Sequence, residues 1–227
     1  MSTSYYSHVL WDWNGTLLDD RDLALSIVND MLGKRDLAPI SMATYLTLFD
    51  HPVMDFYRAI GLGPEVMPVA QVAAEFQSGY TAGYRNCQLQ PGAEQVLWGL
   101  RKLGVKQSVL SASQRHTLRQ LVTHFGAAAH FQSLLGLGDH LAHSKIELAE
   151  TWLAKQPFLP KRVLLIGDTT HDFDTAKAIG CDCLLVARGH QSRGKLAECG
   201  VPVIDDLCRL AERCDASISE CLFGLSD

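Results

Sequence analysis

The chain has 227 residues, of which 47% are apolar, and its 20 Lys and Arg against 25 Asp and Glu give a net charge of −5. The length excludes a single small core and suits one large α/β domain or a domain that carries an insert, because domains run to roughly 100–200 residues. No basic block is longer than a pair such as Lys161 and Arg162, which argues against a nucleic-acid partner.

The sequence carries no pattern typical of a membrane or secreted protein. No stretch approaches the roughly 18–20 apolar residues that cross a bilayer, and the N-terminal segment up to His8 has neither a basic flank nor an apolar core. We therefore expect a cytoplasmic protein that does not bind membranes. The cysteines form an odd set without a C-x-x-C pair, and we expect them all to be reduced thiols: Cys87, Cys181, Cys183, Cys199, Cys208, Cys214 and Cys221.

The first part of the chain predicts one strand followed by helices. Residues 8–12 form a short apolar run typical of a buried strand, and apolar side chains recur at helical spacing over residues 17–32, before Gly33. The helical pattern continues over residues 39–87, interrupted only by Pro and Gly, with no convincing strand. We expect residues 18–87, called the insert below, to form an all-helical unit.

From Pro91 onward, strands alternate with helices. The predicted strands cover residues 106–110, 162–166, 182–186 and 201–204, and the predicted helices cover residues 91–103, 113–125, 144–155 and 172–179, with a further helix from residue 205. Repeated strand-then-helix order indicates an α/β core with a mostly parallel sheet flanked by helices. We assign residues 1–17 and 88–227 to this core. Its ligand site is expected at the carboxyl ends of the strands.

Polar residues follow the first two strands of the predicted core. Asp12 and the turn-forming Asn14 and Gly15 come directly after the first strand, where backbone N–H groups could surround an oxyanion or a phosphate. Ser111 and Ser113 follow the next strand and were expected to open a helix, whose free N–H groups favour anions.

Charged residues complete the same pattern further along the chain. Lys145 opens a helix, and a lysine near a strand-end cleft suits a dianionic substrate. Asp168 and Asp172 follow the strand over residues 162–166 and offer the oxygen ligands that Mg²⁺ prefers. Taken singly, these side chains are more often helix caps or surface charges. Their shared position after core strands favours one functional site.

Four segments resemble, in order and spacing, the motifs of the haloacid dehalogenase superfamily. They are V-L-W-D-W-N-G-T-L-L-D-D around Asp12, S-V-L-S-A-S ending at Ser113, Lys145 itself, and V-L-L-I-G-D-T-T-H-D-F-D-T-A-K-A-I-G around Asp168. The insert resembles the helical cap of phosphoglycolate-phosphatase-like and nucleotidase-like members. The resemblance covers the whole chain and implies a Rossmann-like catalytic core with an inserted cap.

The resemblance also implies a division of roles. Asp12 would be the nucleophile that forms an aspartyl-phosphate. The ligands of Mg²⁺ would be the Asp12 carboxylate, the Asn14 main-chain carbonyl and Asp168, with Asp172 bound directly or through water. A further set, Ser111, the Ala112 N–H group and Lys145, would hold the transferring phosphoryl group.

Asn14 departs from the family pattern, in which most phosphatases carry a second aspartate as general acid and base. An amide cannot transfer a proton, so a contribution of roughly 10²–10⁴-fold is at stake. Three interpretations stay open. Another group supplies the proton, the leaving group is good enough to need little help, or the protein turns over slowly and binds a phosphate ligand. The histidine candidates for the first are His51, His143, His171 and His190.

The insert is expected to set specificity. Asp50, His51 and Arg58 are its polar candidates to face substrate. Its aromatic side chains are expected to pack helices together rather than to line a pocket: Tyr45, Phe49, Phe56, Tyr57, Phe76, Tyr80 and Tyr84. The sequence thus predicts a Mg²⁺-dependent phosphohydrolase of a small phosphorylated substrate, active as a monomer or homodimer. The alternative is a catalytically impaired member that binds a phosphate ligand or a protein partner.

Overall fold

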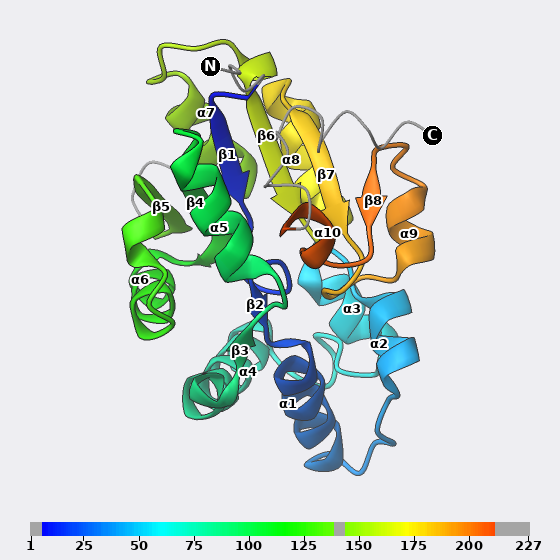
Figure 1. The fold of residues 1–227 in the computed structure, drawn as a ribbon. Helices are drawn as coiled ribbons and strands as arrows, with labels where there is room; N and C mark the ends of the chain where they lie inside the picture. The colour runs from blue at the N-terminus through cyan, green and yellow to red at the C-terminus, as the bar shows by residue number, and fades with distance from the viewer. Residues whose placement is uncertain (1–5, 139–143, 212–227) are drawn as a thin grey trace.

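A computed structural model describes residues 6–138 and 144–211 of the chain. Its centre is a six-stranded parallel sheet in the order β5-β4-β1-β6-β7-β8 (Figure 1). The strands are β1 (His8–Trp11), β4 (Lys106–Gln114), β5 (Ser133–Leu137), β6 (Val163–Gly167), β7 (Asp182–Val186) and β8 (Val203–Ile204). The predicted α/β class with a parallel sheet flanked by helices is confirmed.

Helices cover both faces of this sheet because its strands alternate apolar side chains between two cores. Val9 and Trp11 of β1 belong to one buried cluster, which includes side chains of α5, α6 and α10, whereas Leu10 belongs to the other, with side chains of α7, α8 and α9. These helices are α5 (Ala93–Lys102), α6 (Arg115–His124), α7 (Lys145–Leu153), α8 (Thr170–Ile179), α9 (Arg193–Ala197) and α10 (Cys208–Ala211). Short 3₁₀ turns cover η1 (Tyr84–Asn86), η2 (Ala128–His130) and η3 (Pro160–Arg162).

The insert carries four helices that lie beyond the carboxyl ends of the strands, at the bottom of Figure 1. They are α1 (Arg21–Gly33), α2 (Met42–Leu48), α3 (Val53–Ala59) and α4 (Val69–Gly83). In α1, Ala24, Ile27, Val28 and Met31 are buried at the three- and four-residue spacing of one helix face. Because these side chains belong to the same cluster as Val9 and Trp11, the insert and the sheet share one apolar core.

Three elements differ from the sequence expectations. Strand β5 was not predicted: it is an edge strand of five residues, S-L-L-G-L, and so short an apolar run does not distinguish a strand from a helix segment. Strands β2 (Leu18–Asp19) and β3 (Gln88–Leu89) pair antiparallel where the insert joins the core, and two-residue strands leave no periodic signal. As a result, the first helix begins at Arg21 rather than at residue 17.

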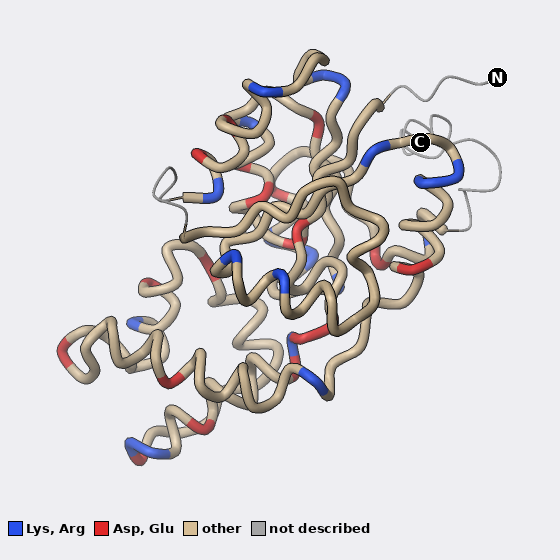
Figure 2. Tube along the Cα trace, turned by 90° about the vertical axis from the view of Figure 1, so that its left-hand side faces the viewer, with Lys and Arg blue, Asp and Glu red and all other residues tan. Residues whose placement is uncertain are grey.

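Charged side chains are dispersed over the described trace. In Figure 2, basic and acidic positions are intermixed over both the core and the insert. Among the described residues, none of the helices combines the length and the apolar character that crossing a membrane requires. Four of the predicted thiols that lie in the described part, Cys87, Cys181, Cys183 and Cys199, form no disulfide.

His8 is a titratable side chain buried in this core. It is 1% exposed, its Nε2 atom lies 3.0 Å from the Ser108 hydroxyl oxygen, and its ring meets that of Trp152 edge-on at 4.7 Å. Burial, with a smaller contribution from the charge of Lys106, lowers the pKa of His8 to about 4. The folded protein therefore keeps His8 neutral at pH values where an unfolded chain would protonate it.

We expect the free energy of unfolding to decrease as the pH is lowered from about 6.5 to 4. The reason is that the unfolded state binds a proton in this range, whereas folded His8 does not. Between pH 7 and pH 5 the wild type should lose about 2 kcal/mol more than His8→Gln. Urea denaturation at both pH values measures this difference. His116→Gln, at an exposed histidine, is the matched control and should keep the wild-type pH dependence. Identical pH dependence in wild type and His8→Gln would contradict the prediction.

Candidate active site

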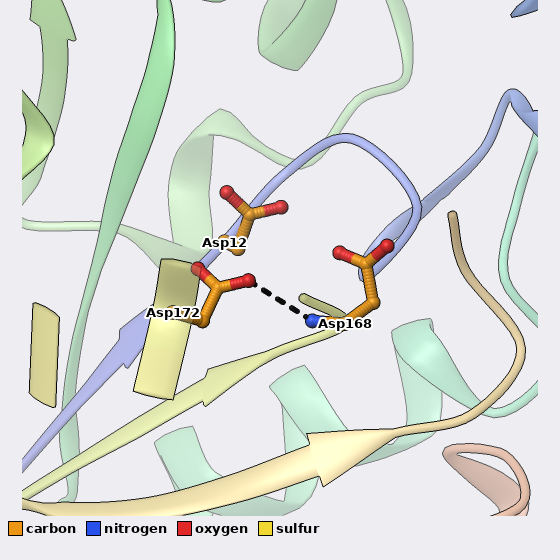
Figure 3. A group of neighbouring side chains, drawn as sticks. All are labelled: Asp12, Asp168 and Asp172. Atoms are coloured by element: carbon orange, nitrogen blue, oxygen red, sulfur yellow. Dashed lines mark hydrogen bonds between the residues drawn. The ribbon is translucent and has the colours of Figure 1, made fainter. Parts of the chain in front are cut away.

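Three buried carboxylates meet at the carboxyl ends of neighbouring strands. Asp12 follows β1 and Asp168 follows β6, and the parallel register that pairs Trp11 with Ile166 brings the two aspartates side by side. Asp172 lies in the first turn of α8. One oxygen from each of the three side chains lies within 4.8 Å of the others, and all three carboxylates are directed to a common point (Figure 3).

Hydrogen bonds from the chain hold two of these carboxylates in place. The Asp172 Oδ2 atom accepts from the Thr169 N–H group at 3.0 Å, the Thr169 hydroxyl at 2.7 Å and the Asp168 N–H group at 3.2 Å (Figure 3). The Asp168 Oδ1 atom accepts from the Thr16 hydroxyl at 2.8 Å, and its Oδ2 atom accepts from the His190 N–H group at 2.7 Å. Asp172 thus also caps its helix, while Asp168 is fixed by two loops.

Lys145 is the counter-charge at this point. It is the first residue of α7, it is only 3% exposed, and its Nζ atom donates to Oδ1 of both Asp12 and Asp172. Burial works to lower the pKa of Lys145, but the two carboxylates outweigh burial and hold that pKa above its ordinary value. The ammonium group is therefore charged and is paired with Asp12 and Asp172.

The charge balance of the site leaves room for a divalent cation. When all three carboxylates are ionised, they outnumber the Lys145 ammonium group by two negative charges. Burial raises the pKa of Asp12, Lys145 opposes this shift, and Asp172 and Asp168 add to it. Burial likewise raises the pKa of Asp168, and the nearby His190 lowers it in part. A hard cation such as Mg²⁺ prefers carboxylate and carbonyl oxygens, so the donor set fits that ion.

The serine motif lies at the end of β4, directly beside β1. The strand continues to Gln114, and helix α6 begins at Arg115, so the expectation that Ser111 and Ser113 open a helix is wrong. Ser111 and Ala112 line the same cavity as Asp12. The Ser111 hydroxyl oxygen accepts from the Ser113 N–H group at 3.1 Å, and the Ser113 hydroxyl donates to Asn14 Oδ1 at 2.9 Å.

The loop after Asp12 needs glycine at its tightest point. Gly15 has a φ of +78°, and a Cβ atom there would lie 2.3 Å from an Asp168 carboxylate oxygen. This close approach brings the loop against the carboxylate cluster. The Asn14 main chain is consequently positioned beside Asp168, where its carbonyl could serve as a metal ligand.

The Asn14 side chain is bound by a network that the sequence analysis did not identify. Its Nδ2 atom donates to Asp20 Oδ2 and to the Tyr80 hydroxyl, each at 2.7 Å, and that hydroxyl also donates to Asp20 Oδ2 at 2.7 Å. Asp20 Oδ1 accepts from the Gly15 N–H group at 2.9 Å and lies 3.1 Å from His190 Nε2. Asp20 belongs to the Asp-Asp pair at the end of the first motif, which is the one sequence signal that could have indicated it.

His190 pairs with Asp20 as a buried ion pair. Burial works to lower the pKa of His190, but Asp20 outweighs it, and the pKa rises to about 9. For Asp20, burial works in the opposite direction, and His190, Tyr80 and Asn14 bring the pKa below its ordinary value. The other ring nitrogen of His190, Nδ1, lies 3.0 Å from the Tyr45 hydroxyl oxygen. Because both nitrogens have protein partners, His190 holds Asp20 in place and is not free to protonate a leaving group.

Two of the other histidine candidates, His51 and His171, line the same cavity as Asp12. His51 and His171 stack on each other, with ring centroids 4.7 Å apart, at the wall of the cavity. Burial, with a smaller effect of His171, lowers the pKa of His51 to about 4. His143 lies outside the described residues.

A cavity of about 500 Å³ lies between the carboxylate cluster and the insert. The expectation that the aromatic side chains of the insert only pack its helices is wrong, because all of them except Tyr84 line this cavity: Tyr45, Phe49, Phe56, Tyr57, Phe76 and Tyr80. Of the polar candidates, only His51 lines it. Asp50 instead lies 2.8 Å from Lys195 Nζ, and the exposed Arg58 pairs with Asp55 at 2.6 Å.

Curated relatives of this chain include both kinases and phosphatases by name. The tyrosine-protein kinase PtkA of Mycobacterium tuberculosis is 30% identical over 187 residues, which are 80% of this chain and 62% of PtkA. This chain therefore spans less than two thirds of that relative. A phosphoglycolate phosphatase of Pseudomonas fluorescens is 29% identical over 216 residues, covering 91% of this chain and 79% of the relative.

Solved structures share the fold. A haloacid dehalogenase-like hydrolase of Streptococcus pneumoniae superposes with a TM-score of 0.79 at 15% identity, covering 92% of this chain and 98% of that one. The family model for haloacid dehalogenase-like hydrolases matches residues 9–186, which include the four segments around Asp12, Ser113, Lys145 and Asp168. The chain belongs to the haloacid dehalogenase-like hydrolase family.

Proposed function

We propose that the protein is a Mg²⁺-dependent phosphohydrolase of small phosphorylated compounds. The observation that carries this proposal is the buried cluster of Asp12, Asp168, Asp172 and Lys145 at the base of the cavity. Relatives named phosphoglycolate phosphatase support the same reaction class. In this proposal the insert, residues 18–87, is a cap over the catalytic core of residues 1–17 and 88–227.

Asp12 would act as the nucleophile. One of its carboxylate oxygens attacks phosphorus in line with the ester bond, the bond between phosphorus and the leaving oxygen breaks, and an aspartyl-phosphate forms. The leaving oxygen takes a proton from solvent water, because Asn14 has none to transfer. A water molecule then attacks the same phosphorus, and inorganic phosphate and the free Asp12 carboxylate result.

The remaining side chains would hold and neutralise the phosphoryl group. Lys145, the Ser111 hydroxyl and the Ala112 N–H group line the cavity beside Asp12 and would bind the phosphoryl oxygens. Asp12, the Asn14 carbonyl and Asp168 would bind Mg²⁺, with Asp172 bound directly or through water. When bound, Mg²⁺ reduces the repulsion between the nucleophile and the phosphoryl oxygens.

Asn14 limits the chemistry of this site. Its amide donates to Asp20 and Tyr80 and has no proton to exchange with a leaving oxygen. The absence of a proton donor at position 14 favours substrates whose leaving group needs little protonation. It also sustains a second candidate, a member in which hydrolysis is slow and the aspartyl-phosphate or a phosphate ligand persists. The likeness to PtkA is compatible with that candidate, because a persistent aspartyl-phosphate could pass its phosphoryl group to an acceptor other than water.

We expect Mg²⁺-dependent phosphate release from a panel of phosphate monoesters, acyl phosphates and nucleotides. Asp12→Asn should lower the rate by a factor of at least about 10³, because the amide is a poor nucleophile. Removal of Mg²⁺ with EDTA should abolish release, and added Mg²⁺ should restore it. Asp22→Asn, at an exposed carboxylate of α1, is the matched control and should retain wild-type activity. Phosphate release at the level of Asp12→Asn on every compound would favour the second candidate.

Asn14→Asp should raise kcat/KM for alkyl phosphates at least about tenfold more than for aryl phosphates, because alkoxide leaving groups gain most from an acid. In the wild type, Asn14 Nδ2 lies 2.7 Å from Asp20 Oδ2, so the new carboxyl group would face the Asp20 carboxylate. The negative charge of Asp20 should keep the new carboxyl group protonated. The double variant Asn14→Asp with Asp20→Asn removes that neighbour and should lower the pH at which the gain disappears. An equal gain for both ester classes would show that another group already supplies the proton.

A further inference from the structure

The cavity above Asp12 has two walls of different chemistry. The core side presents carboxylates, Lys145 and the serine motif, whereas the insert side presents apolar and aromatic side chains, among them Phe49, Met54, Phe56 and Phe76. Phe49 and Phe56 meet edge-on with ring centroids 5.5 Å apart, and Phe76 stacks on Tyr80 at 5.9 Å. A substrate with its phosphoryl group on Asp12 would therefore direct its leaving group into an apolar environment.

The insert side offers no cation to a charged leaving group. Among the described residues that line the cavity, the cations are Lys145 and His190, whose imidazolium is paired with Asp20, and there is no arginine. The Lys145 ammonium group is already bound to Asp12 and Asp172 on the core side. Burying a carboxylate against this wall without a partner would be costly. The site consequently disfavours esters of the phosphoglycolate kind, in which the leaving group carries its own negative charge.

Uncharged polar leaving groups are also poorly served. Gln77, Gln114 and Thr117 line both the cavity and an adjoining open groove, so these polar side chains lie at its mouth. Deeper in the cavity, the Tyr45 and Tyr80 hydroxyls already have protein partners, which leaves Tyr57 and His51 as the polar groups of the insert side. A polyol placed there would replace few of its hydrogen bonds to water. An aromatic ring has no such need, and an apolar cavity of about 150 Å³ already holds benzene. The present cavity of about 500 Å³ is large enough for a ring together with the phosphoryl group.

On the basis of the proposed hydrolase function, we infer that the substrates are aryl phosphate monoesters whose ring lies against the aromatic wall of the insert. The second support is Asn14, which supplies no proton to the leaving oxygen. A phenol has a pKa of about 10, against about 15.7 for water, so a phenolate leaves without an acid far more readily than an alkoxide. The aromatic side chains of the insert and the Asn14 amide thus favour the same class of ester.

A panel of four esters separates the two contributions. Phenyl phosphate supplies both ring and acidic leaving group, cyclohexyl phosphate supplies only an apolar ring, glycerol phosphate is polar, and phosphoglycolate is charged. We expect kcat/KM for phenyl phosphate to exceed that for phosphoglycolate by at least about tenfold. Cyclohexyl phosphate should share the low KM of phenyl phosphate but have a lower kcat. A phosphotyrosyl peptide in the same assay tells whether the aryl ester is carried on a protein or is a small molecule.

Ala73 allows the missing cation to be introduced without disturbing the core. It is an exposed residue of α4 that lines the cavity, and Arg is tolerated almost as well as Ala in a helix. Ala73→Arg should shift the ratio of kcat/KM values toward phosphoglycolate by about fivefold. Ala74→Arg, at an exposed position of the same helix that does not line the cavity, is the matched control and should leave the ratio unchanged.

A binding measurement distinguishes failure of this inference from failure of the hydrolase function. Phenylphosphonate and phosphonoacetate are not esters, so calorimetry with Mg²⁺ reports their affinity without turnover. Phenylphosphonate should bind at least about tenfold more tightly. Tighter binding of phenylphosphonate with no hydrolysis of any ester would sustain the aromatic site and overturn the hydrolase. Hydrolysis in which phosphoglycolate or glycerol phosphate is preferred over phenyl phosphate would overturn the inference and leave the hydrolase standing.

Discussion

Burial of negative charge at the carboxyl ends of β1 and β6 is the constraint on which the site depends. The register of two parallel strands and the first turn of a helix hold Asp12, Asp168 and Asp172 together. All three side chains are buried, so water solvates their charges poorly. One buried lysine offsets part of their repulsion. Backbone and hydroxyl donors stabilise Asp168 and Asp172 further, and these hydrogen bonds bring the loops around the aspartates close together.

A buried ion pair, Asp20 and His190, supports the carboxylate cluster. Asp20 and His190 come from opposite ends of the chain, and each is bonded to a loop of the carboxylate cluster, Asp20 through the Gly15 N–H group and His190 through its own N–H group to Asp168. The pair is neutral as a whole, so it orders the site without adding to its charge. The Asn14 side chain belongs to this structural network through its bonds to Asp20 and Tyr80.

The sequence predicted the positions of the buried carboxylates better than the lining of the pocket. Asp12 and Asp168 could be placed because each follows an apolar run, and parallel strands bring such positions to one edge. The edge strand β5 and the pair β2–β3 were missed because they are short or half-buried. The aromatic wall and the Asp20–His190 pair depend on contacts between residues up to 170 positions apart in the chain, which no local pattern records. A buried aromatic looks the same in a sequence whether it packs a helix or faces a cavity.

Asn14 joins the two halves of the molecule through a single amide. Its oxygen accepts from Ser113 on the sheet, and its nitrogen donates to Asp20 and to Tyr80 on the insert. Any movement that separates α4 from the strand ends must break the bonds on one side of this amide. Opening of the cavity and movement of the loop that follows Asp12 are therefore mechanically linked. Asn14 connects the sheet to the insert through the hydrogen bonds of its side-chain amide.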